Sequence, residues 1–68
     1  MADAELPTAA TLSSLSSQVN DMLVRVGADA EASDRSPTEG VAAALYDAER
    51  ALRSVRRALE RAERALGA

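Results

Sequence analysis

The 68-residue chain contains no cysteine and no histidine, and its only aromatic residue is Tyr46. The lack of cysteine excludes a disulfide framework, and without histidine the usual zinc sites are excluded as well. Acid–base catalysis would depend on carboxylates or on Tyr46, and no pair of carboxylates lies on an apolar face where burial would tune it. We therefore predict that the chain is not an enzyme and has no catalytic, cofactor-binding or metal-binding residues.

Long apolar runs are also missing. No stretch of about 18 apolar residues is present for a membrane span, and the first residues, MADAELPTAA, lack the basic and apolar regions of a signal peptide. The three glycines, Gly27, Gly40 and Gly67, are too far apart for a phosphate-binding loop. These absences predict a cytoplasmic protein that does not contact membranes, with no small-molecule ligand evident.

Alanine and arginine dominate what is present. Alanine supplies 16 residues and all eight basic residues are arginine, a composition that favours helices over strands and suggests a GC-rich bacterial genome. Residues 1–49 hold nine acidic residues and two arginines, a net charge of −7, whereas residues 50–68 hold six arginines and two glutamates, a net charge of +4. This asymmetry favours pairing of the two parts of the chain in an antiparallel or head-to-tail arrangement.

A first helix is predicted by apolar residues at alternating spacings of three and four, which place one stripe along a helix. They are Leu12, Leu15, Val19, Met22 and Val26. Thr8 is a suitable N-cap, and Gly27 is a suitable residue just beyond the C-terminus. We predict a short tail over 1–7, a helix over 8–27 and a polar loop over 28–36, of which the first residues could add another helical turn.

A second helix is predicted over 37–66. Ser36, Pro37 and Glu39 match a capping box with proline at the first helical position. Within the helix, leucines repeat every seven residues and small or β-branched residues alternate with them, which completes a heptad seam. The seam consists of Leu45, Leu52, Leu59 and Leu66, interleaved with Val41, Ala48, Val55 and Ala62.

These two segments predict an all-α fold, an antiparallel two-helix hairpin with coiled-coil-like heptad packing in a single domain. The register that pairs Val26 with Val41 also pairs Leu12 with Val55, and it leaves the second helix about two turns longer than the first. A two-helix core is marginal at this length, so we expect oligomerisation to complete a helical bundle such as a four-helix bundle.

The predicted protein interface follows the seam and its shoulders. Leu23 and Val24 widen the apolar side of the first helix and are predicted to contact a second subunit, the alternative being that they are scattered surface apolar residues. An alanine column beside the leucines would let another helix approach closely. The predicted interface residues are Leu12, Leu15, Val19, Met22, Leu23, Val24, Ala44, Leu45, Ala51, Leu52, Val55, Ala58, Leu59, Ala65 and Leu66.

A second candidate surface is a ridge of arginines on the outside of the second helix. This arginine ridge consists of Arg50, Arg53, Arg57, Arg61 and Arg64. It could bind an acidic protein or a nucleic acid, and the alternative is a solvated outer face. Nucleic acid is disfavoured, because such binders are more often basic overall and single-strand binders use stacking aromatics.

The string TLSSLS, followed by a proline-containing turn and VAAALY, resembles the small helical-hairpin needle subunits of type III secretion systems. The arginine-rich leucine repeat departs from that family. The main prediction is a protein–protein association module, acting as a homo-oligomer or on a larger protein partner. The alternatives are a small antitoxin-like or transcription-associated regulator that uses the arginine ridge, and an accessory subunit or co-chaperone of a larger complex.

Overall fold

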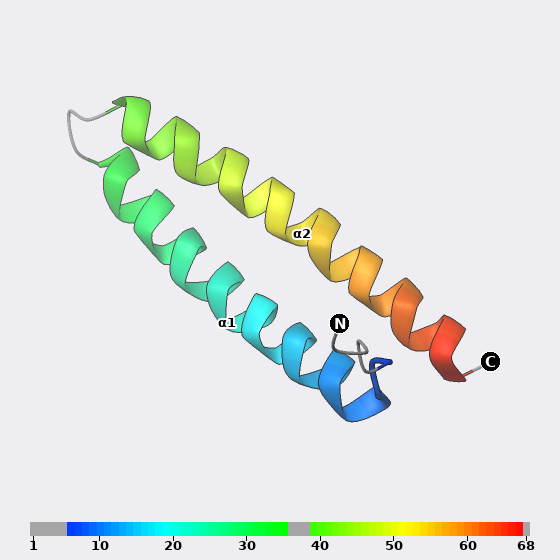
Figure 1. Ribbon diagram of the computed structural model, residues 1–68. Coiled ribbons are helices and arrows are strands. Elements are labelled where there is room, and N and C mark those ends of the chain that lie inside the picture. The colour runs from blue at the N-terminus through cyan, green and yellow to red at the C-terminus, as the bar shows by residue number, and fades with distance from the viewer. Residues whose placement is uncertain (1–5, 36–38, 68) are drawn as a thin grey trace, which may run out of the picture.

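The computed structural model describes residues 6–35 and 39–67, and these form an antiparallel pair of helices (Figure 1). Helix α1 spans Ala9–Asp34 and helix α2 spans Glu39–Gly67. The pair is 49 Å long, and its radius of gyration is 15.7 Å, whereas a compact domain of this length would have about 11 Å. The hairpin is therefore elongated, and much of each helix faces away from its neighbour.

Helix α1 begins at the predicted N-cap. Thr8 has extended backbone angles, φ −105° and ψ 166°, and its Oγ1 accepts a hydrogen bond from the backbone N–H of Thr11 at 3.1 Å. This bond satisfies one of the donors that every helix N-terminus leaves unpaired. The predicted capping box of the second helix falls on Ser36 and Pro37, which lie outside the described residues.

The end of α1 differs from the prediction of a helix over 8–27 and a polar loop over 28–36. The helix continues through Gly27 to Asp34, and no described glycine has a positive φ, so Gly27 does not terminate it. The alanine-rich stretch after Gly27 favours helix, and Ala30 is fully buried against α2. Packing therefore extends α1 by two turns, until the backbone N–H of Arg35 bonds the carbonyl of Ala32 at 3.3 Å.

This extension changes the register between the helices. The Ser16 hydroxyl donates to Glu63 Oε1 at 2.7 Å, and Gly27 lies beside the carboxylate of Glu49. The N-terminal half of α1 therefore packs against the last turns of α2. The predicted pairing of residue 12 with residue 55 is wrong, and α2 does not extend two turns beyond its partner.

The core of the hairpin is small. The buried apolar side chains are Leu12, Val19, Leu23, Ala30 and Ala42, of which three are large. Those of α1 recur at intervals of seven and four residues and so form one line along the helix. On α2 the leucines at 45, 52 and 59 are half-buried. Such a core supplies only a few kcal/mol of net stability, at most about 3–5.

Gly27 offers a direct test of how closely the helices approach. Replacing Gly27 with alanine should raise the free energy of unfolding by about 0.5–1 kcal/mol, because glycine is the poorer residue inside a helix. The new Cβ would lie 3.0 Å from Glu49 Oε2, the end of a side chain that can move aside. Urea unfolding monitored by circular dichroism measures the change.

Gly40→Ala is the matched control, since a Cβ there meets nothing within 4 Å. A clear destabilisation by Gly27→Ala, with none by Gly40→Ala, would show instead that the contact between Gly27 and Glu49 is rigid.

Candidate functional site

Five large apolar side chains of the described residues share one exposed surface of the hairpin. We call this surface the apolar face, and it consists of Leu15, Met22, Val41, Val55 and Leu66, each between 41% and 49% exposed. The sequence predicted that these residues pack within the hairpin seam. The structure instead turns four of them to the side of the line along which the two helices meet, and Leu66 continues the leucine line into the last turn of α2, beside them.

Helical geometry places the two α1 residues on that side. Successive residues lie about 100° apart around a helix, so Met22 and Val24 fall on opposite sides of the buried Leu23. Leu15 lies one heptad before Met22 and shares its side. Leu23 is buried between the helices and Val24 is 73% exposed on the far side, so neither lies on the apolar face. That they contact a second subunit stays a prediction.

The side of the helix contact opposite the apolar face is polar. The positions of its residues show which side of α2 carries the valines. Glu49 lies against Gly27, and Glu63 accepts the hydrogen bond from Ser16. These two glutamates follow the leucines at 45 and 59 by four residues, on one side of the leucine line. Val41 and Val55 lie on its other side, so the valines of α2 and the exposed apolar residues of α1 share one face.

The alanine column predicted beside the leucines borders this face. Ala44, Ala51, Ala58 and Ala65 are all exposed. They lie on the outer shoulder of α2, next to the valines, and carry no bulk that would hold another helix away. The seam positions Ala48 and Ala62 lie between the valines and Leu66 on the face itself.

The polar side of the helix contact was not predicted from the sequence. Glu49, Arg56 and Glu63 repeat at sevens and are half-buried on the side toward α1. Ser16 and Gly27 are small, and they leave room for long side chains to bury their methylene groups while their charged ends stay near water. The α2 residues that accompany the leucines at the contact with α1 could lie three positions or four positions after each leucine. In the structure they are the residues four positions after each leucine.

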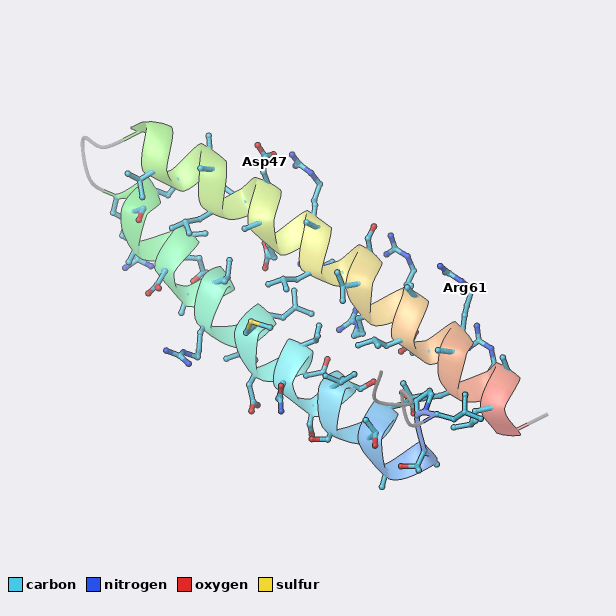
Figure 2. The ribbon with its side chains drawn as sticks, viewed as in Figure 1. Asp47 and Arg61 are labelled. Carbon is cyan, nitrogen blue, oxygen red and sulfur yellow. The ribbon has the colours of Figure 1, made fainter. Side chains whose placement is uncertain are left out.

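The arginine ridge lies on the outside of α2, and all five of its members are exposed. Figure 2 shows Asp47 and Arg61 pointing away from α1. Arg50 pairs with Asp47, and Arg53 lies 3.2 Å from Glu49 Oε2. Arg57 donates to Ser54 Oγ at 3.1 Å. Two of the five arginines are thus already paired within their own helix, which favours a solvated outer face.

Comparison with known proteins adds no relative. No protein-family model matches the chain, and no curated protein or solved structure gives a significant match. The resemblance to needle subunits therefore depends on short strings of residues alone. The function must be inferred from the chemistry of the surfaces themselves.

The described residues offer no enclosed site. Within 6–35 and 39–67 there is no pocket, and no three acidic side chains are grouped so that they could hold a metal ion. Neither α1 nor α2 is long and apolar enough to cross a bilayer. The features available for recognition are therefore the outer surfaces of the hairpin.

Tyr46 lies where α2 faces the end of α1, and its surroundings shift its pKa. Its pKa is raised above 10.0, first because the phenol is partly removed from water, then because the negative charges of Asp34 and Glu31 oppose its ionisation. A hydrogen bond to Asp34 and the charge of Glu49 act in the same direction. Because Asp34 and Glu31 belong to α1, the shift depends on the folded hairpin.

This raised pKa predicts a loss of stability in alkali. The folded state holds the phenolic proton more tightly than the unfolded state, so the contribution is complete below pH 10 and disappears as the pH rises through the folded pKa. The chain has no lysine, so Tyr46 is the side chain expected to lose a proton in this pH range, below the range in which arginine does so. Tyrosinate absorbance should titrate above pH 10 in the folded chain, and Tyr46→Phe should flatten the stability profile in this range. A titration at the ordinary pKa would contradict the contact with α1.

Proposed function

We propose that this chain is a non-enzymatic protein-association module that binds a helical protein surface through the apolar face. The observation that supports the proposal is the separation of surfaces. Five large apolar side chains gather on one side of the hairpin, and the arginine ridge lies elsewhere. Small soluble proteins rarely leave a contiguous apolar surface uncovered unless it binds something.

The size of the core supports the same proposal. Among the residues with described burial, only three large side chains are buried between α1 and α2, and a scaffold this small usually needs a staple, a metal or a partner. The chain has no cysteine for a staple. Covering the apolar face would add stability to the hairpin at the same time as it forms the complex.

In this proposal, binding results from the burial of apolar side chains and involves no chemical reaction. Val41, Val55 and Leu66 would insert between side chains of the partner, and the alanine column would allow its helix to approach closely. The competing regulator hypothesis needs an anionic partner for the arginine ridge. The pairing of Arg50 with Asp47 and of Arg53 with Glu49 weakens that hypothesis.

A site-specific photo-cross-linker tests the proposal. A benzophenone amino acid at position 55, introduced in the cells that make the protein, should form a covalent adduct with a protein. The same group at position 54 is the control, because Ser54 lies about 100° away, on the outside of α2. Absence of any adduct from position 55, or equal adducts from both positions, would contradict the proposed function.

A further inference from the structure

We propose that the apolar face binds a second copy of this chain, in an antiparallel two-fold arrangement that gives a four-helix bundle. This inference rests on the proposed function and names the partner. The charge distribution along the hairpin, the size of the face and the register of the helices each support it.

Charge is divided between the two ends of the hairpin. Near the turn, as far as the level of Gly27 and Glu49, residues 27–35 and 40–49 contain five acidic residues and one arginine, a net charge of −4. Over the rest of the hairpin, residues 6–26 contain one acidic residue and one arginine, and residues 50–67 contain six arginines and two glutamates, so the net charge is +4. The hairpin is therefore an electric dipole along its 49 Å axis.

This dipole decides the orientation of the second copy. In a parallel pair, the acidic ends would lie together and the basic ends would lie together. In an antiparallel pair, the acidic end of each copy lies over the arginine-bearing end of the other. The arginines lie on the outside of α2, away from the apolar face, so their attraction to the second copy acts over more than one interhelical distance and should weaken as salt is added.

The size of the apolar face favours a partner that supplies an equal face. Covering the remaining exposed part of its five large side chains gains free energy in proportion to the apolar area removed from water. Association also costs translational and rotational freedom, which offsets much of the gain from one face alone. A second copy doubles the apolar area that is covered, because a two-fold interface brings the same patch of both copies together.

The register places the two-fold axis near the middle of the face. Ser16 lies level with Glu63 and Gly27 with Glu49, so Met22 lies level with Val55. Val55 is also close to the middle of the 29-residue α2. In the antiparallel dimer Val55 therefore faces Val55 of the second copy, whereas in a parallel dimer it would face Met22.

Engineered cysteines distinguish these arrangements, because the natural chain has none. Under a mild oxidant, Val55→Cys and Met22→Cys should each cross-link to itself in the purified protein. Mixing the two variants should add little mixed product. Val24→Cys is the control for random collision, since position 24 is exposed away from the face. Sedimentation equilibrium of the unmodified chain should give twice its mass of 7.1 kDa.

Two results would overturn the proposal. Efficient cross-linking only in the mixture of Val55→Cys and Met22→Cys would establish the parallel arrangement. A mass of 7.1 kDa at all concentrations up to the millimolar range would exclude the second copy. In that case an adduct from position 55 with a different protein would still support the proposed function, whereas the absence of any adduct would end both.

Discussion

Replacing Leu23 with alanine is expected to lower the free energy of unfolding by about 2–4 kcal/mol. Leu23 is only 8% exposed, and it is one of three large side chains buried between α1 and α2. A loss of this size is a large part of the stability available to so small a core. Most chains should therefore lose their helical circular dichroism signal at room temperature, or melt well below the unmodified protein at the same concentration.

The adjacent residue supplies the control. Val24 is 73% exposed, so Val24→Ala removes little buried surface and slightly improves the helix propensity. Its stability should change by less than about 0.5 kcal/mol. Equal losses for the two variants would mean that α1 does not present Leu23 to α2, and the observed helix face would be wrong.

Replacing Val55 with aspartate is expected to weaken self-association strongly while the isolated hairpin keeps its fold. Val55 is 44% exposed in the hairpin, so a carboxylate there remains hydrated in the monomer. In the complex it would be buried without a partner at a cost of at least about 2 kcal/mol. In a two-fold dimer the residue occurs twice, so the dissociation constant should rise about 1,000-fold. Sedimentation equilibrium measures the change.

Ser54→Asp introduces the same charge one position away, on the outside of α2. An aspartate there can pair with Arg57, which already donates to the Ser54 hydroxyl. This variant should keep the mass of the unmodified protein. If both aspartate variants dissociate the assembly equally, net charge governs association and the apolar face does not. If neither does, the interface lies elsewhere.

The two helices and the cap at Thr8 could be predicted from sequence because each depends on local information. A stripe of apolar residues repeating at three and four indicates a helix, and a threonine before it supplies the capping oxygen. The end of α1 could not be predicted from Gly27, because glycine terminates a helix only when packing does not extend it. The burial of Ala30 against α2 determines that outcome, and it is a tertiary contact.

The faces of α2 were harder to predict, since its apolar surface is wider than one neighbouring helix can cover. The leucines at 45, 52 and 59 are compatible with partners on either side. Hydrophobicity alone selects the side of Val41 and Val55. The structure selects the side of Glu49 and Glu63, because Ser16 and Gly27 leave space for their stems. The positions of Ser16 and Gly27 indicate which side of α2 packs against α1. They could be interpreted in this way only once the alignment of α1 with α2 was known.

Both described ends of the chain, at Leu6 and Gly67, lie together at the end of the hairpin away from the turn (Figure 1). In the proposed antiparallel dimer the two pairs of described ends would emerge at opposite ends of a rod about as long as one hairpin, 49 Å. Whatever is attached to one copy would be held at that distance from whatever is attached to the other. The dimer would thus act as a spacer of fixed length as well as a joint.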